Sequence, residues 1–222
     1  MSKVFDLFII GGGINGAGIA RDAAGRGLSV CLADKGEIGG ATSSWSTKLI
    51  HGGLRYLENY EFKLVRESLI EREIVYKIAK PISKPIPFII PYVDKIRPAW
   101  LIKIGLFLYD NLGGKSNIPK SKTLDLKKQF PNILKEKYKT GFQYFDIQID
   151  DKKLTKLNVK DAKRNKAKIL EYNKVKKAEI IDNEWVISLQ SGKKIKSKVL
   201  INASGPWINE TLKKNIKIKS KK

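Results

Sequence analysis

Three glycines near the N-terminus constrain the fold of this chain more than any other feature. They form the pattern G-x-G-x-x-G as Gly11, Gly13 and Gly16, directly after the apolar run Val4–Ile10. Small or apolar residues continue through residues 14–24. Between a strand and a helix, these glycines allow a tight turn, close approach of the backbone to a pyrophosphate, and close packing of the helix on the strand. The sequence therefore predicts a strand, a turn and a helix whose N-terminus binds phosphate.

A second apolar run, residues 28–33, completes a predicted βαβ unit and ends at Asp34. Such units connect two parallel strands through a right-handed crossover. Asp34 lies 21 residues after Gly13, a position that suits a carboxylate accepting hydrogen bonds from an adenosine ribose and disfavours a 2′-phosphate. We therefore expect an α/β protein that binds a dinucleotide.

A polar segment, residues 41–57, follows and suits a polar ligand better than a hydrophobic core. It holds five Ser and Thr side chains, a Lys, a glycine pair and the only His of the chain. Arg55 presents a planar fork of donors that would bind a phosphate, with a surface salt bridge as the alternative. His51 would act as a general base, because imidazole exchanges protons near neutral pH. The alternative for His51 is a structural or ligand-contacting histidine.

The middle of the chain changes character at a group of prolines. Residues 61–80 repeat apolar side chains at helical spacing, which predicts an amphipathic helix. Four prolines between residues 81 and 91 then indicate a domain boundary, and we expect a loop-rich stretch from there to about Thr140. Within it, the apolar segment 100–109 predicts a buried helix, with an anchor at a membrane interface as the alternative.

The last third of the chain is predicted to be mainly β structure. Residues 141–149 alternate as a strand, and Asp150 or Asp151 would cap a helix that runs to about Lys166. Turn residues separate the later strand-like runs, which are 167–172, 174–181, 184–190 and 195–203.

The composition excludes several classes of protein. With one Cys and one His, the chain lacks the ligands of a structural zinc site and the cysteines of a disulfide, and we expect no metal. Its 44 Lys and Arg against 22 Asp and Glu give a formal charge of +22. That charge would attract nucleic acid, an anionic membrane surface or a phosphorylated ligand, and a solvated Lys-rich surface is the simpler explanation. Because the basic residues lack interleaved aromatics, we expect no nucleic acid.

The beginning of the chain shows no secretory signal, and no apolar run approaches the ~20 residues of a membrane-spanning helix. We therefore expect the protein to stay on the cytoplasmic side.

Four segments, taken together and in this order, resemble the FAD-dependent, respiratory (aerobic) glycerol-3-phosphate dehydrogenases. They are the glycine-rich stretch 10–27, the Ser-rich stretch that continues to Leu57, Arg97-Pro98-Ala99-Trp100, and Asn202-Ala203-Ser204-Gly205-Pro206-Trp207. The resemblance runs from Asp6 to about Leu212 and covers well under half of a typical family member.

The resemblance implies an α/β fold: a glutathione-reductase-like FAD-binding Rossmann domain with a β-meander, plus the beginning of a substrate-binding cap. It implies that residues 1–84 and 141–212 are two segments of the FAD-binding domain. Residues 85–140 would be part of the cap, and residues 213–222 a basic tail.

The resemblance also implies an activity. Enzymes of this family oxidise sn-glycerol 3-phosphate to dihydroxyacetone phosphate with FAD and pass the electrons to membrane quinone. Arg55 and Tyr56 would bind the substrate phosphate, and His51 is the candidate for the catalytic base. A related FAD oxidase that passes electrons to oxygen is an alternative.

The FAD contacts that the resemblance implies come from several parts of the chain. The glycine turn would hold the pyrophosphate, Asp34 the ribose, residues 42–51 the ribityl chain and isoalloxazine, and the Val175 backbone the adenine. The full set is Gly11, Gly13, Ile14, Asn15, Gly16, Asp34, Lys35, Thr42, Ser43, Ser44, Ser46, Lys48, Leu49, His51, Val175, Ser204 and Gly205.

The chain departs from the family mainly in length. Asp34 and Ser204 replace the usual Glu and Thr, which are mild changes. The second glycine-rich flavin motif and the rest of the cap would lie beyond residue 222, so we expect weak FAD retention and little activity for this chain alone. A separate C-terminal chain would complete it; a catalytically incomplete fragment is the alternative. Peripheral attachment to the inner face of the cytoplasmic membrane would suit a quinone-reducing enzyme.

Overall fold

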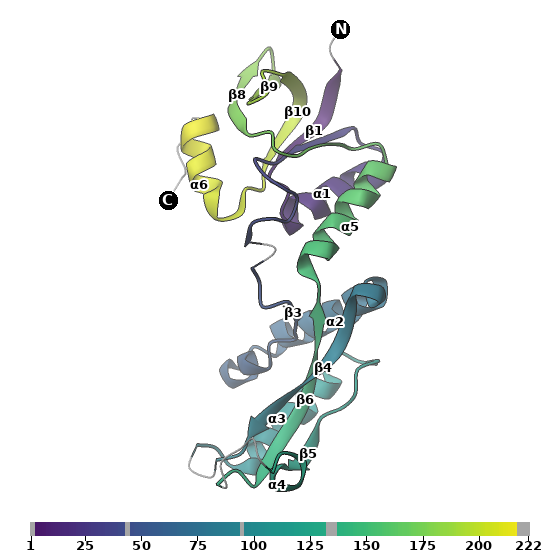
Figure 1. Cartoon of the computed structure of the whole chain (residues 1–222), viewed down its shortest axis with the longest axis vertical. Helices are drawn as coiled ribbons and strands as arrows, with labels where there is room; N and C mark the ends of the chain where they lie inside the picture. The colour runs from purple at the N-terminus through teal and green to yellow at the C-terminus, as the bar shows by residue number, and fades with distance from the viewer. Residues whose placement is uncertain (1–2, 43–44, 94–95, 132–136, 217–222) are drawn as a thin grey trace. The chain divides into compact units, whose positions relative to one another are not determined.

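The computed structural model describes residues 3–42, 45–93, 96–131 and 137–216 (Figure 1). The chain forms two compact units. The first unit combines Met1–Thr47 with Asp150–Lys222, and the second is the continuous segment Lys48–Ile149. Each unit has its own sheet.

The sheet of the first unit contains four parallel strands in the order β7-β2-β1-β10. Leu7 of β1 pairs with Val30 on one side and with Val199 on the other, which places β1 in the middle. β1 and β2 were predicted from their apolar runs, and β7 and β10 from strand-like runs between turn residues. Every residue of β2 is buried, as expected of a parallel strand covered on both faces. Their bounds are β1 Val4–Ile10, β2 Val30–Ala33, β7 Lys168–Leu170 and β10 Lys194–Asn202.

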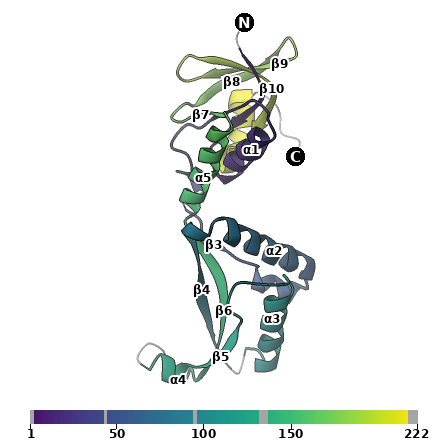
Figure 2. The same cartoon turned by 90° about the vertical axis from the view of Figure 1, so that its right-hand side faces the viewer.

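Two helices cover one face of this sheet: α1 (Ile14–Gly25) and α5 (Asp151–Arg164). They lie side by side in both views (Figures 1 and 2). Small residues such as Ala20 and Ala162 are fully buried where the helices meet the core, which allows close packing. The Asp150 side chain accepts a hydrogen bond from the Lys153 N–H at 2.8 Å, so it is the N-cap of α5.

A β-meander continues the sheet and helps enclose its other face. Strands β8 (Val175–Ile181) and β9 (Glu184–Leu189) pair antiparallel through a turn at Asp182 and Asn183, whose φ angles are 51° and 61°. Positive φ at both central residues is typical of a type I′ hairpin. Side chains of the meander, such as Ile187, pack with β1 and β2 in one hydrophobic cluster.

The chain after β10 is helical, where we had expected a basic tail from residue 213. It forms η4 (Gly205–Trp207), α6 (Ile208–Thr211) and η5 (Leu212–Ile216). Ile216 is buried in the cluster between the meander and the parallel strands. Leu212 and Ile216 are four residues apart and both pack against the core, so residues 213–216 form a packed helical segment.

The second unit is built on a four-stranded antiparallel sheet around β6 (Thr140–Ile149). Its other strands are β3 (Leu49–Ile50), β4 (Ser83–Pro91) and β5 (Lys122–Asp125). The expected loop-rich stretch therefore contains two strands. The prolines of β4 are tolerated because β4 is an edge strand and Pro85, Pro87 and Pro91 share one parity, so their missing N–H groups lie on one side.

Helices pack on this sheet around Val65, Leu69 and Tyr109. They are η2 (Leu54–Asn59), α2 (Phe62–Ile78) and α3 (Ala99–Asn111). Two short helices, η3 (Lys80–Ile82) and α4 (Leu126–Gln129), also belong to this unit. For residues 100–109, the prediction of a helix was confirmed and the prediction of full burial was wrong. The helix exists and buries Leu106 and Tyr109, but Trp100 is 62% exposed and Phe107 67% exposed. Among the described residues, no helix is long and apolar enough to cross a membrane.

The boundaries of the two units differ from the boundaries that we expected near residues 84 and 140. Strands β3 and β4 both pair with β6, and β6 runs without a break to Ile149, so residues 48–84 and 141–149 join the second unit. Which segments bind cofactor and which bind substrate stays a prediction.

Candidate functional site

The turn after β1 requires glycine at two of the predicted positions. Gly11 has a φ of 105°, and a Cβ atom there would lie 2.5 Å from the carbonyl oxygen of Ala203. A Cβ atom on Gly16 would lie 1.9 Å from the carbonyl oxygen of Gly11. Gly13 caps α1 with no side-chain hydrogen bond, and the first turn of α1 has no acidic residue. The start of α1 therefore presents its positive dipole end beside a turn that leaves no room for side chains.

Asp34 lies at the end of β2 and faces this turn. Its Oδ2 atom accepts a hydrogen bond from the Gly12 N–H at 2.6 Å, and its Oδ1 atom accepts one from the Gly36 N–H at 2.8 Å. Each carboxylate oxygen has two lone pairs, so both are still able to accept a hydrogen bond from a ligand hydroxyl. Asp34 is thus a brace for the glycine turn as well as the predicted ribose acceptor.

A cavity of about 280 Å³ lies within the first unit along this turn. Its volume is slightly below the roughly 300–1,000 Å³ of ligand sites, so an extended dinucleotide would lie partly in it and partly on the open surface. The cavity brings together ten predicted residues: Gly11, Gly13, Ile14, Asn15, Asp34, Lys35, Thr42, Val175, Ser204 and Gly205. Gly16 does not line the cavity itself; it packs against the carbonyl oxygen of Gly11, which does.

One wall of the cavity was not predicted. Trp207 lines it, and the Lys35 Nζ atom lies 4.0 Å from the centroid of the Trp207 ring. Asn215 also lines it, and the Asn215 Nδ2 group donates to the carbonyl oxygen of Val175 at 2.8 Å. Trp207 belongs to the motif 202–207, one of the four segments that carry the family resemblance. No spacing rule connects Asn215 with Val175, because only tertiary packing brings η5 onto β8.

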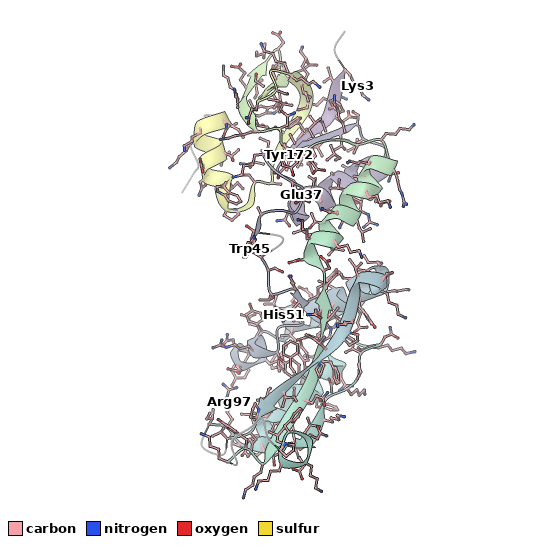
Figure 3. All side chains as sticks on the ribbon, in the orientation of Figure 1. Lys3, Glu37, Trp45, His51, Arg97 and Tyr172 are labelled. Atoms are coloured by element: carbon pink, nitrogen blue, oxygen red, sulfur yellow. The ribbon has the colours of Figure 1, made fainter. Side chains whose placement is uncertain are left out.

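The hydroxyl-rich stretch is only partly at the cavity. Thr42 lines it. The Ser46 Oγ atom instead donates to the Asp151 Oδ2 atom at 2.6 Å, next to the start of α5. Ser43 and Ser44 lie outside the described residues. Trp45, between them and Ser46, is 85% exposed (Figure 3).

The remaining predicted residues belong to the second unit. Lys48 adopts a φ of 56°, its carbonyl oxygen accepts from the Ile149 N–H at 2.9 Å, and Leu49 begins β3. His51 is exposed and is labelled in Figure 3. Arg55 and Tyr56 lie on η2, and both are exposed. These residues share one short segment, and their contact with a cofactor or substrate stays a prediction.

Arg97 holds η2 from outside through Glu58. The Arg97 guanidinium donates to both carboxylate oxygens of Glu58, with NH2 to Oε2 at 2.7 Å. Hydrogen bonding from Arg97 lowers the pKa of Glu58, and the charge of Arg55 contributes in the same direction. Whether Arg55 binds a phosphate or forms a surface salt bridge stays a prediction.

The glycine turn, the acid after β2 and the cavity at the ends of the parallel strands define a dinucleotide-binding α/β unit. The model of the FAD dependent oxidoreductase family matches residues 6–221. The chain belongs to this family.

Two curated relatives and one solved structure place the chain further. It is 46% identical over 213 residues to the D-erythritol 1-phosphate dehydrogenase of Brucella abortus. This alignment covers 93% of this chain and 42% of that protein. It is 45% identical over 210 residues to the aerobic glycerol-3-phosphate dehydrogenase of Escherichia coli K12, with 92% and 42% covered. The structure of the glycerol-3-phosphate dehydrogenase of Bacillus halodurans complexed with FAD superposes with a TM-score of 0.68 at 27% sequence identity. The superposition covers 95% of this chain and 36% of that chain. The chain thus spans well under half the length of these proteins.

FAD is the cofactor that the family implies, and the described residues fit it. The missing Cβ atoms at Gly11 and Gly16, the helix start at Gly13 and the carboxylate of Asp34 suit a diphosphate joined to a ribose. The apolar part of the cavity wall, which includes Val175 and Trp207, suits the flat face of an aromatic ring.

Proposed function

We propose that this chain binds FAD and forms the cofactor-binding part of an enzyme that oxidises sn-glycerol 3-phosphate to dihydroxyacetone phosphate. The arrangement of Gly11, Gly16 and Asp34 carries the cofactor part of this proposal. The substrate part is supported by the two relatives, whose names both specify the phosphate ester of a small polyol. The substrate class is therefore a polyol phosphate, with D-erythritol 1-phosphate as the second candidate.

The chemistry of the proposed reaction divides between cofactor and protein. Oxidation of a secondary alcohol removes a hydride from carbon and a proton from oxygen. When bound, FAD supplies the acceptor for that hydride. His51 accepts the hydroxyl proton on its imidazole. Arg55 donates two parallel hydrogen bonds to the substrate phosphate, and the Tyr56 hydroxyl donates a third.

We further propose that the electrons go to membrane quinone and that α3 contacts an anionic membrane surface. Trp100, Ile104 and Phe107 are all exposed and, at spacings of four and three residues, share one face of α3. Lys103 lies on the same stretch of helix. Exposed aromatic residues beside basic ones are typical of helices that lie at the surface of a membrane. In this proposal the protein lies at the inner face of the cytoplasmic membrane.

Two alternatives keep the cofactor site and change the rest. In the first, the chain is one part of an enzyme that a separate C-terminal chain completes. As a related oxidase, the enzyme would pass its electrons to oxygen. Oxygen consumption without quinone separates an oxidase from a dehydrogenase.

FAD titration of the purified chain tests the cofactor part. We expect a saturable change in flavin absorbance, and Gly16→Ala weakens binding at least about tenfold because its Cβ atom collides with Gly11. Gly18→Ala is the matched control, since a Cβ atom there meets nothing within 4 Å. Failure of the unchanged chain to bind FAD, or equal affinity in all three proteins, contradicts the proposal.

Turnover tests the substrate part. The FAD-loaded chain is assayed with sn-glycerol 3-phosphate and with D-erythritol 1-phosphate, with a soluble quinone or oxygen as acceptor. Each assay is run with and without a separately produced chain that supplies the C-terminal part of a relative. If neither polyol phosphate reduces the flavin in any of these combinations, the proposed substrate class is rejected.

A further inference from the structure

The second unit encloses a buried polar cluster made by three elements. Arg72 of α2 donates through NH1 to the Asp146 Oδ1 atom of β6 at 2.9 Å and to the Phe145 carbonyl oxygen at 3.1 Å. The Tyr109 hydroxyl of α3 donates to the same Oδ1 atom at 2.7 Å. Arg72 and Asp146 are each only 4% exposed. A buried ion pair of this kind keeps its geometry because breaking it would leave an unpaired charge without water.

One hydrogen bond links this cluster to the segment that carries the predicted substrate residues. The Gly52 N–H, itself buried, donates to the Tyr109 hydroxyl oxygen at 2.7 Å. The hydroxyl therefore accepts from Gly52 and donates to Asp146 at the same time. Burial, followed by the nearby charge of Asp146, raises the pKa of Tyr109, so its hydroxyl keeps the proton that it donates.

Packing around Gly52 leaves little freedom to the segment. A Cβ atom on Gly52 would lie 2.3 Å from Leu69 Cδ2 and 2.9 Å from Tyr109 Cε2. The next residue, Gly53, has a φ of 72° and starts η2, whose Leu54 packs on the same buried cluster of Leu69 and Tyr109. The segment is thus fixed on its inner side.

The outer side of the same segment carries the exposed side chains of His51, Arg55 and Tyr56. A backbone hydrogen bond from the Tyr56 N–H to the carbonyl oxygen of Gly53, the residue after the fixed Gly52, has a length of 2.8 Å and joins this turn to the exposed residues. Movement at Gly52 would therefore move all three side chains.

We propose that Tyr109 is a positioning residue, whose hydroxyl, held by Asp146 and Arg72, fixes the Gly52 backbone and with it the His51–Tyr56 segment. The consequence for catalysis rests on the proposed function, in which Arg55 and Tyr56 bind the substrate phosphate. Tyr109 itself does not touch the substrate in this proposal. Removing its hydroxyl weakens phosphate binding and leaves the cofactor site of the first unit unchanged.

The experiment compares Tyr109→Phe with the matched control Tyr144→Phe in the FAD-loaded 222-residue chain. Tyr144 packs edge-on against Tyr109, with ring centroids 5.9 Å apart, so the control removes a hydroxyl from a neighbouring ring of the same cluster. Hydrogen exchange is measured at the amides of residues 48–56. Loss of one buried hydrogen bond should speed exchange at Gly52 about tenfold in Tyr109→Phe and leave it unchanged in Tyr144→Phe.

Steady-state kinetics supply the second readout, in whichever assembly turns over the polyol phosphate. We expect Tyr109→Phe to raise KM for that substrate about tenfold with a much smaller change in kcat and an unchanged FAD affinity. A merely structural role would instead lower FAD content and the amount of folded protein together.

The outcomes separate this inference from the proposed function. Unchanged exchange at Gly52 in a folded Tyr109→Phe chain overturns the positioning role, whatever the substrate is. Faster exchange with an unchanged KM overturns the link to substrate binding. If Tyr109→Phe does not fold, exchange at Gly52 in the unchanged chain decides: an amide as fast as an unstructured one overturns the proposal. If none of these proteins turns over a polyol phosphate, the proposed function is rejected. The hydrogen-exchange result at Gly52 is independent of that outcome.

Discussion

The carboxylate of Asp34 accepts a hydrogen bond from the Gly12 N–H at 2.6 Å, which ties the end of β2 to the turn after β1. An acid at this position is usually considered only as the ribose ligand. Here it also shapes the turn that receives the diphosphate, because it holds the Gly12 N–H of that turn, while its second oxygen accepts a hydrogen bond from the Gly36 N–H at 2.8 Å. The two halves of the cofactor site are therefore coupled through one side chain.

Asp34→Asn tests this coupling. The new amide group places an N–H donor against the N–H of Gly12 or Gly36, so we expect a loss of about 1–3 kcal/mol in stability and an FAD affinity at least about tenfold weaker. Thermal unfolding and FAD titration measure both. Asp22→Asn, which removes an exposed carboxylate paired with Arg26 on α1, should change neither. Parallel behaviour of the two variants would remove Asp34 from the site.

Cys31 provides a natural probe of unfolding, because it is the only cysteine of the chain and is fully buried in β2. Burial raises the pKa of its thiol to about 12. At pH 8 we expect a thiol reagent to label the folded chain only through unfolding, and bound FAD to slow labelling further. Labelling is followed by mass spectrometry, with the denatured chain as the reference. Immediate labelling of the native chain would contradict the packing of β2.

FAD protection of Cys31 should disappear in Gly16→Ala and persist in Gly18→Ala. The same two variants then report cofactor binding through a residue that does not touch the cavity. Equal protection in both would mean that FAD stabilises the unit from another place.

Glu37 should give the first unit a measurable acid sensitivity. Hydrogen bonds from Lys152 and Lys156, at 2.8 Å and 2.5 Å, lower its pKa to about 2. A carboxylate with a lowered folded pKa stabilises the fold above its unfolded value, about 4.3, and this contribution is lost as the pH falls toward 2. The side chain is 35% exposed, so the effect is small. Figure 3 labels Glu37 in the first unit.

The measurement is the melting temperature of Glu37→Gln relative to the unchanged chain as a function of pH. We expect the variant to be less stable at pH 7 and the difference to vanish near pH 2. Changing Lys152 and Lys156 together to Met should reproduce the loss at pH 7. A difference that is independent of pH would show that the ion pairs do not cause it.

The exposed face of α3 should decide membrane attachment. Phe107→Glu and Trp100→Glu should each reduce sedimentation with vesicles of phosphatidylglycerol and phosphatidylcholine, because a charge replaces an inserted ring. Ile180→Glu, at a similarly exposed apolar residue of β8, is the control. Binding that survives both α3 changes but falls with added salt would instead assign attachment to the charge of +22 alone.

The first unit was largely predictable because its signals are local. The apolar runs at β1 and β2, the glycine turn and the cap at Asp150 each act within a few residues, and the structure confirms them. The family resemblance was confirmed by the match over residues 6–221. The cavity contacts of Asn215 were not predictable, because they depend on how a late helix packs on β8.

The second unit was harder to predict for a physical reason at each place. Prolines normally argue against a strand, but β4 is an edge strand and accommodates Pro85 and Pro87. The apolar sequence of α3 indicated burial, yet the described part of the second unit covers only one side of that helix, and Phe107 stays exposed. Sequence periodicity shows which residues are apolar and does not show what covers them.

The central place of β1 in its sheet has a consequence for biosynthesis. Ile10 pairs with Ala33 on one side and with Asn202 on the other, so a ribosome must extend the chain as far as β10 before β1 gains its second neighbour. The continuous segment Lys48–Ile149 needs no such wait and can collapse while translation continues. During that interval Phe8 and Ile9 belong to an incompletely paired apolar strand, and this is where we expect a nascent chain to depend on chaperones.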